Sequence, residues 1–314
     1  MNQFKLFMET KRYIDPLNDI AFKKIFGSEP NKDLLIDLLN KVLRGRKKIN
    51  DLIYNKNEHH GAGKDEGSIS FDLLCTGDKG EQFIVEVQRE RHANFKERSL
   101  FYTSRLISEQ APKGKVKEWN YALKEVYLIA ILEKFTVQDS KQKFLYDICL
   151  CDRDTGEIFY DKLGYTYIQL RNFVKQENEL ESDLDRWLYI LKHIRTMDKI
   201  PAYLRQPIFK KMFNIAEYSN LTKEERMYYD ASLKRDWDNY SALETAKQDG
   251  EAKGKLEGKI EGRIEGKIEG KIEGKIEGKH EQALETARKM KLKHYSVEEI
   301  MEMSGLSAEE IEEI

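Results

Sequence analysis

The sequence contains little of what marks a secreted, membrane-spanning or strongly basic protein. Three cysteines in 314 residues are too few for a disulfide framework, and they lack the second ligand pair of a zinc site. The formal net charge is −2, so nucleic-acid contact would have to come from local basic patches such as residues 41–48. No apolar stretch is long enough to span a bilayer, and no cleavage signal follows the first residues. We therefore expect a cytoplasmic protein without membrane contact.

Hydrophobic residues make up 40% of the chain and charged residues 35%, which is enough apolar content for a packed core. Hydrophobic periodicity predicts an α/β domain over residues 1–240. Its strand 125–132 is apolar almost throughout, which favours a central place in the sheet. The predicted helices are 19–26, 31–43, 94–110, 184–194, 208–218 and 223–235, and further strands are predicted at 144–151 and 165–170.

Two strand-like stretches, 68–75 and 83–88, carry a single acidic residue each. The residues between them, 78–80, suit a three-residue hairpin loop that closes with glycine in the left-handed conformation. The loop sets the pairing register, so that Asp72 faces Glu86.

The same register sets Ser70 opposite Gln88. Like charges directly opposed on neighbouring strands are destabilising, because their Cβ atoms lie only about 4.5–5.5 Å apart. Two carboxylates at that separation, with a nearby carbonyl and water, form an oxygen-rich site of the kind that Mg²⁺ or Mn²⁺ prefers. We therefore expect a divalent cation between Asp72 and Glu86.

Beyond residue 240 the sequence changes character. Residues 241–280 form a charged linker dominated by a Gly-Lys-Ile-Glu repeat. A four-residue repeat advances about 40° too far per step to keep one face of a helix, and glycine in every turn disfavours helix formation. We expect a polar spacer there, with a helical or self-associating state as the alternative.

Residues 281–314 regain ordinary sequence and predict a small helical tail. Two capping boxes, Ser296 to Glu299 and Ser307 to Glu310, mark its helix starts. The spacing is similar to a helix-turn-helix module, but the acidic second half favours docking of a protein partner over insertion into the DNA major groove.

Four motifs in one order resemble the PD-(D/E)XK nuclease superfamily, and within it the Rpn family of recombination-promoting nucleases, also labelled transposases. They are a first helix that begins at Asp19 and ends at Gly27, Phe71-Asp72, Ile84-Val-Glu86-Val-Gln88, and Phe95-x-x-Arg98-x-x-x-Tyr102. The resemblance implies a restriction-endonuclease-like core, in which a mixed central sheet is flanked by helices. It also implies hydrolysis of phosphodiester bonds in DNA.

The resemblance further implies roles for particular residues. Asp72, Glu86 and the Val87 carbonyl would hold Mg²⁺ or Mn²⁺, and Gln88 occupies the position where the superfamily usually has lysine. Gln88 cannot carry a charge, although it can hydrogen-bond an attacking water. Asp19 would be an additional acidic group near the metal, and a helix N-cap is the alternative for Asp19.

Lys23, Arg98 and Tyr102 are candidates for DNA contact. The alternatives are a solvated face for Lys23, and for the other two a helix that packs Tyr102 on the sheet with Arg98 extended outward. His59, His60 and His92 lie in loop-like sequence without a partner, and we expect no role for them.

Three functions remain open at this point. The first is a metal-dependent DNA endonuclease, for which cutting both strands would favour a homodimer. The second is a non-catalytic interaction or DNA-tethering protein with a degenerate nuclease fold. The third is a transposase that joins DNA ends, for which the sequence shows no evidence of strand transfer.

Overall fold

The structure, a computed structural model, describes residues 11–56, 58–59, 69–91, 94–112, 119–138 and 143–314. Two compact units divide the chain, Met1–Trp237 and Asp238–Ile314. Each unit has a hydrophobic core of its own.

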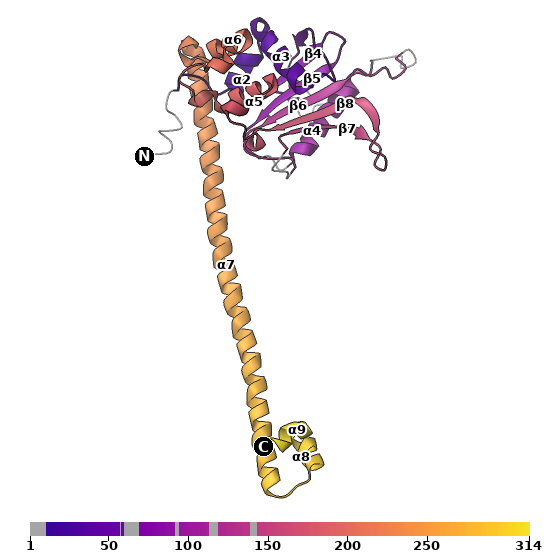
Figure 1. Cartoon of the computed structure of the whole chain (residues 1–314), viewed down its shortest axis with the longest axis vertical. Coiled ribbons are helices and arrows are strands. Elements are labelled where there is room, and N and C mark those ends of the chain that lie inside the picture. Colours follow the sequence, from indigo (N-terminus) through magenta and orange to yellow (C-terminus); the bar gives the residue numbers. More distant parts are fainter. Residues whose placement is uncertain (1–10, 57, 60–68, 92–93, 113–118, 139–142) are drawn as a thin grey trace. The chain divides into compact units, whose positions relative to one another are not determined.

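A six-stranded mixed sheet forms the centre of the first unit, in the order β1-β4-β5-β6-β8-β7 (Figure 1). β5 is the strand at which the pairing changes, because it runs antiparallel to β4 and parallel to β6. All seven residues of β6 are buried, which confirms its predicted central place. The strands are β1 Leu52–Tyr54, β4 Leu73–Gly77, β5 Gln82–Gln88, β6 Val126–Leu132, β7 Leu145–Cys151 and β8 Ile158–Gln169.

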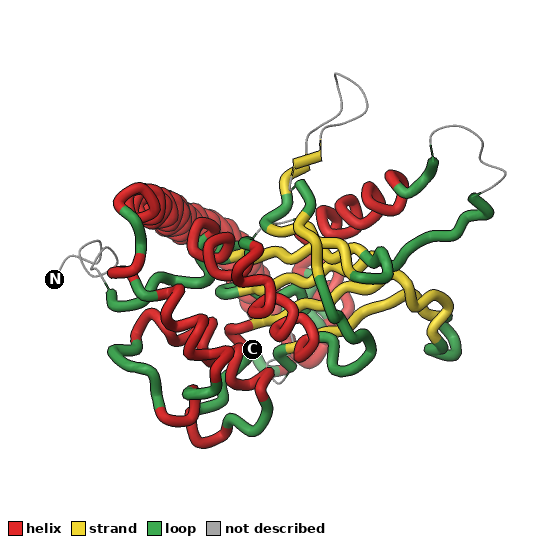
Figure 2. The backbone as a smooth tube through the Cα atoms, turned by 90° about the horizontal axis from the view of Figure 1, so that it is seen from above, coloured by secondary structure: helices red, strands yellow, loops and turns green. Residues whose placement is uncertain are grey.

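Helices cover both faces of this sheet, and most of them gather on one side (Figure 2). Side chains alternate along a strand, so Phe83, Val85 and Val87 of β5 join the core beneath α2, α3, α5 and α6, while Ile84 joins the core beneath α4. These helices are α2 Asp19–Phe26, α3 Lys32–Val42, α4 Phe95–Glu109, α5 Asp183–His193 and α6 Pro207–Ala216.

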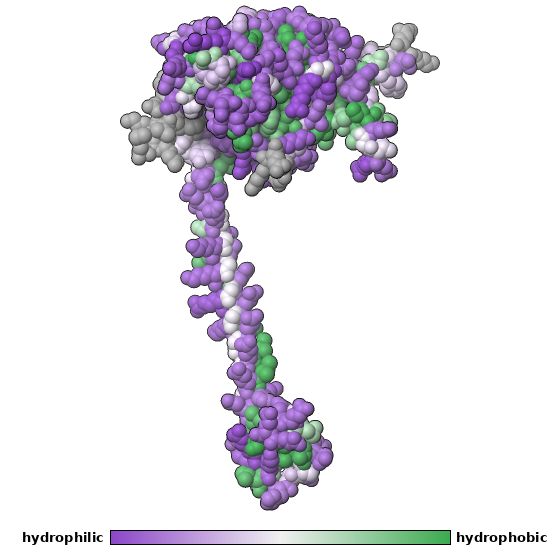
Figure 3. Space-filling view, viewed as in Figure 1, coloured by the Kyte–Doolittle hydropathy of each residue, from purple (hydrophilic) through white to green (hydrophobic). Residues whose placement is uncertain are grey.

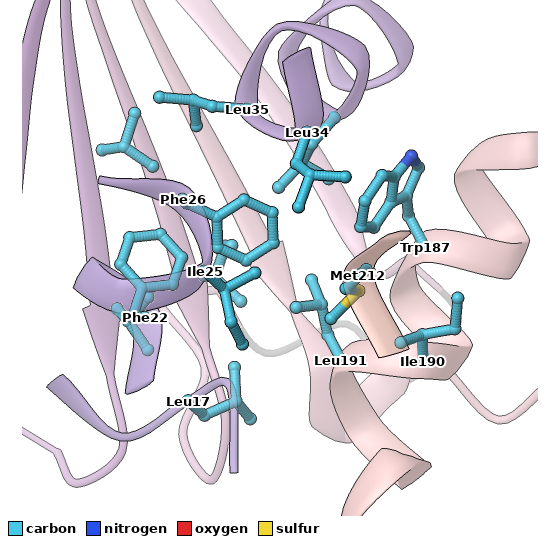
Figure 4. Close-up of a cluster of buried hydrophobic side chains, with 14 of the residues drawn as sticks. Leu17, Phe22, Ile25, Phe26, Leu34, Leu35, Trp187, Ile190, Leu191 and Met212 are labelled. Atoms are coloured by element: carbon cyan, nitrogen blue, oxygen red, sulfur yellow. The ribbon is translucent and has the colours of Figure 1, made fainter. Parts of the chain in front are cut away.

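The larger core is built from apolar stripes that recur every three or four residues along the helices. Phe26 of α2 packs its ring against Trp187 of α5 at a centroid distance of 6.0 Å. Figure 4 shows Leu34 and Leu35 of α3 and Met212 of α6 around the same point. Together these helices hold α2 in the larger core.

The hairpin between β4 and β5 has the predicted loop. Gly80 has a φ of +85°, and the Gly77 N–H donates to the Glu81 carbonyl at 2.8 Å. The register is confirmed as well, with Leu73 opposite Val85 and Leu74 opposite Ile84.

The prediction of one continuous strand over 68–75 is wrong. β4 begins only at Leu73, and the preceding β3, Ile69–Ser70, pairs instead with β2, Glu58–His59. Ser70 therefore does not face Gln88. Phe71 also leaves the expected alternation, because it packs in the core beneath α4 while Leu73 packs on the opposite face.

The Gly-Lys-Ile-Glu repeat is helical, contrary to the expected spacer. It lies within α7, Lys223–Leu292, which matches the alternative of a helical state. The residues that follow the repeat, after Glu281, are good helix formers. Once a helix is nucleated, each further residue adds one hydrogen bond, so the helix can extend through the repeat. The surface along the repeat is largely hydrophilic (Figure 3), and its isoleucines are 51–63% exposed.

The second unit ends in two short helices, α8 Val297–Ser304 and α9 Ala308–Glu312. Both predicted capping boxes are present, and Gly305 ends α8 with a φ of +74°. The small core of this unit consists of Ala287, Ile300, Leu306 and Ile311. Among the described residues, no helix is both long enough and apolar enough to cross a membrane.

Candidate active site

The end of the β4–β5 hairpin brings the two predicted acidic residues together. The Asp72 N–H donates to Glu86 Oε1 at 3.3 Å, and Asp72 Oδ2 accepts the Val87 N–H at 2.7 Å. If the antiparallel ladder continued in register, the Val87 N–H would bond to the Phe71 carbonyl. The Asp72 carboxylate has taken that carbonyl's place, and this explains why the strand pairing stops at Leu73.

The peptide of Val87 also faces this corner. In β5 the even-numbered residues give their backbone groups to β6, since the Gln82 N–H bonds the Glu125 carbonyl and the Gln88 carbonyl accepts from the Glu133 N–H. The N–H and C=O of one strand residue point to the same side. The Val87 carbonyl is thereby directed toward the β4 side, where Asp72 lies.

Both carboxylates are held where ionisation is unfavourable. Burial, and then the charge of Asp72, raise the pKa of Glu86 to about 8. Burial also raises the pKa of Asp72, although the Val87 N–H opposes this shift. Glu86 is only 4% exposed, so a cation that binds here would relieve both desolvation and mutual repulsion.

Gln88 and Arg98 meet at the same oxygen of Glu86. The Gln88 amide donates to Glu86 Oε2 at 3.3 Å, and Arg98 Nη2 lies 3.8 Å from that oxygen. Tyr102 packs edge-on against Phe71 with ring centroids 5.1 Å apart. Arg98 therefore borders the Glu86 carboxylate. Tyr102 packs on Phe71, the residue before Asp72, as the alternative of a tyrosine that packs on the sheet expects.

Asp19 and Lys23 reach the site from the first helix. Asn18, and not Asp19, is the N-cap of α2, because its side chain accepts the Ile20 and Ala21 N–H groups. Asp19 is free of that structural role and forms an ion pair with Lys23 at 2.7 Å. Burial is the main cause of the raised pKa of Asp72; the negative charge of Asp19 raises this pKa further, and the positive charge of Lys23 lowers it. Both side chains therefore lie near the carboxylate pair.

A divalent cation fits these residues. Among the described side chains, no group of three or more His, Cys, Asp or Glu is arranged around one point, so a cation would rely on two carboxylates, a carbonyl and water. Mg²⁺ commonly keeps several waters and takes one or two protein carboxylates. His59 lies in β2, and His60 and His92 fall outside the described residues.

Sequence reasoning missed a charged cluster directly behind the site. Arg89, next to Gln88, lies 2.9 Å from both Asp15 and Glu133 and 3.6 Å from Asp236. An arginine immediately after a buried strand was the only local signal, since its three partners lie far apart in the sequence.

Comparison with known proteins gives a match to a family of nucleases. A family model described as "PD-(D/E)XK nuclease family transposase" matches residues 16–246. Neither the curated proteins nor the solved structures contain a match to this chain.

Proposed function

The chain belongs to the PD-(D/E)XK nuclease family transposases, and from this premise we propose that it is a metal-dependent DNA endonuclease that hydrolyses phosphodiester bonds. The observation that carries the proposal is the buried pair of Asp72 and Glu86, which meet at one corner of the sheet and whose pKa values are both raised by burial. Perturbed carboxylates of this kind are more typical of a functional site than of a structural ion pair.

Asp72, Glu86 and the Val87 carbonyl would hold Mg²⁺ or Mn²⁺. Once bound, the cation would supply Lewis-acid stabilisation of phosphate charge and a lowered pKa for the attacking water. The Asp72 carboxylate remains oriented by the Val87 N–H, and Glu86 is oriented by the Asp72 N–H. These backbone contacts orient both ligands, and the Gln88 amide adds a side-chain contact to Glu86.

In the proposed reaction a water oxygen forms a new bond to phosphorus, and one P–O bond to a deoxyribose oxygen breaks. The water gives up a proton and the leaving oxygen gains one, so the products are a phosphate end and a hydroxyl end. Gln88 can position the water through its amide. Hydrolysis needs fewer parts than the joining of DNA ends, so strand transfer is not part of the proposal.

Plasmid cleavage tests this function. Purified protein in Mg²⁺ or Mn²⁺ should nick or linearise the plasmid, and Asp72→Asn or Glu86→Gln should lower the rate by roughly 100-fold or more. Asp78→Asn is the matched control, because Asp78 lies in the exposed loop of the same hairpin and asparagine suits that turn. Equal cleavage by wild type and both site variants would contradict the proposal.

The alternative is an interaction or DNA-tethering protein that has kept the fold without its chemistry. The neutral Gln88 is the observation in its favour. Calorimetric titration with Mn²⁺ separates the two functions. If the protein is an endonuclease, the wild type should bind Mn²⁺ and Glu86→Gln should not. Absence of Mn²⁺ binding by the wild type would favour the tethering protein.

A further inference from the structure

The strand that carries Glu86 supplies no positive charge to the site. Gln88 is neutral, and its amide is directed at Glu86 Oε2. Phosphoryl transfer gains from a cation that neutralises charge on the phosphate oxygens. Such a cation would have to come from another element.

Arg98 of α4 approaches the same oxygen of Glu86 but does not form a close pair with it. The Nη2 to Oε2 distance of 3.8 Å is too long for a hydrogen bond, and the contact is not the bidentate fork that arginine forms with a dedicated carboxylate partner. The guanidinium thus stands beside the carboxylate without using its donors there.

Aromatic rings hold Arg98 in this position. The guanidinium carbon lies 5.0 Å from the ring centroid of Phe95 and 5.7 Å from that of Tyr102, three residues before it and four residues after it on the same helix face. Phe95 packs edge-on against Phe135, and Tyr102 against Phe71. The two rings are therefore anchored in the core, and they restrict a side chain that is otherwise flexible.

The helix itself is fixed to the sheet beneath these rings. The Thr103 hydroxyl lies 2.7 Å from the Tyr165 hydroxyl of β8, and Ser99, one position after Arg98, is 1% exposed. α4 cannot slide without breaking this buried contact.

Arg98 also retains unused hydrogen-bonding capacity. Its Nε is buried and has no hydrogen-bond partner among the described residues, while the side chain as a whole is 30% exposed. Two other cations nearby are already engaged, Arg89 with Asp15 and Lys23 with Asp19. Arg98 therefore has a fixed position, unused hydrogen-bond donors and a side chain that solvent can reach.

We propose that Arg98 is a catalytic residue that contacts the scissile phosphate and supplies the positive charge that Gln88 cannot provide. This inference rests on the proposed endonuclease function and names the group that stabilises its transition state. Arginine suits the task, because its planar guanidinium stacks on aromatic rings and presents several donors to phosphate oxygens. The charge comes from the facing helix instead of the strand.

Arg98→Gln in the full chain tests the inference, with Arg105→Gln as the matched control. Arg105 lies two turns later on α4 and pairs with Glu109 at 2.9 Å. We expect Arg98→Gln to lower kcat by roughly 100- to 1000-fold, with little change in DNA affinity measured in Ca²⁺. Arg105→Gln should retain the wild-type kcat.

Two further readouts separate a catalytic role from a structural one. Mn²⁺ affinity should rise about threefold or more in Arg98→Gln, because a positive charge beside Glu86 is removed; a variant that merely disturbs the fold would bind Mn²⁺ less well. Adding Gln88→Lys to Arg98→Gln should restore part of kcat, since it returns a cation to the same carboxylate. Arg98→Lys keeps the charge but loses the stacked plane, and it should show an intermediate kcat.

The outcomes distinguish this inference from the function on which it rests. If the wild type does not cleave DNA, the endonuclease function and the role of Arg98 are both contradicted. If the wild type cleaves and Arg98→Gln has the same kcat, only the role of Arg98 is contradicted. A loss confined to DNA affinity, with a salt dependence weaker by about one phosphate contact, would make Arg98 a binding residue and overturn the inference.

Discussion

At the scale of single residues, Glu86 occupies a place that opposes its own ionisation. Burial and the neighbouring Asp72 carboxylate raise the pKa of Glu86 to about 8, whereas the pKa of a glutamate in an unfolded chain is about 4.3. The folded protein therefore binds a proton at Glu86 that the unfolded chain releases. The stabilisation is complete below the unfolded pKa and is lost as pH rises through the folded pKa.

This asymmetry predicts a pH-dependent effect of Glu86→Gln on stability. In EDTA the variant should gain thermal stability over wild type as pH rises from 5 to 8, by on the order of 2 kcal/mol, or several degrees in Tm. Thermal unfolding followed by circular dichroism measures the difference. Asp78→Asn is the control, because the Asn50 amide holds the pKa of Asp78 below its usual value. Asp78 is therefore ionised throughout this range, and the difference of Asp78→Asn from wild type should stay constant. A constant difference for Glu86→Gln as well would contradict the prediction.

The sequence predicts the central residue pair because the information is local. Gly80 in the left-handed conformation fixes the loop, the loop fixes the register, and the register sets Asp72 beside Glu86. The end of the ladder is not local information. It depends on a side-chain oxygen of Asp72 competing with the Phe71 carbonyl for one N–H, and no residue pattern records the outcome of that competition.

At the scale of elements, the glycines of the α7 repeat contact no side chain among the residues that the structure describes. A Cβ built at Gly258, Gly262, Gly266 or Gly270 meets nothing within 4 Å. Glycine lowers helix stability by about 1 kcal/mol relative to alanine, so its recurrence weakens the helix without improving any contact within the described part of the chain.

Alanine at these four glycines should therefore strengthen α7. We expect the full chain to keep more of its 222 nm circular dichroism signal on heating, with a gain of about 1 kcal/mol per substitution. Gly305→Ala is the control of opposite sign, because the φ of +74° at Gly305 strains an L-residue and should destabilise the second unit. Reduced helix signal in the repeat variant would show that the glycines serve a contact not made within one chain.

Sequence patterns identify the elements of the first unit more reliably than those of the repeat. Apolar stripes such as Leu34, Leu35 and Leu38 of α3 are enforced by burial, so periodicity records them. The repeat has no buried face, and its propensities disfavour a helix that the structure nevertheless contains. The short β1 was missed for a related reason, since Leu52–Tyr54 is too brief to show alternation.

At the scale of the whole molecule, residues from distant parts of the chain close around the rear of the site. The Asp15 N–H donates to the Tyr229 hydroxyl at 2.9 Å, and the Asn18 amide donates to Ser232 and Asp236. The first turns of α7 thereby hold the N-cap of α2, the helix that carries Asp19. The first turns of α7 therefore help to stabilise the fold of the first unit.

Tyr229→Phe tests whether the contact between Tyr229 and Asp15 stabilises the first unit. The substitution leaves the buried Asp15 N–H without its acceptor, and it should lower the free energy of unfolding of the first unit by about 1–2 kcal/mol. Tyr228→Phe removes the same atom from a neighbouring ring that is 52% exposed, and it should have no effect. Urea unfolding of the two variants measures both values, and equal stability would contradict the role of Tyr229.

The sequence does not predict this arrangement beyond the position of Arg89 after a buried strand, because its members share no periodicity. Asp15, Arg89 and Asp236 are separated by scores of residues, and each resembles an ordinary surface charge when taken alone. Only the closed tertiary structure brings them together, with Arg89 in contact with both acids.

The orientation of the Val87 peptide has a consequence for how the site can change during evolution. The side chain of Val87 packs into the larger core, whereas the proposed metal ligand is its carbonyl oxygen, which every amino acid possesses. Core packing alone then selects the residue type at position 87. A substitution by isoleucine would alter that packing without removing the carbonyl oxygen, so the proposed metal ligand does not depend on the side chain at position 87.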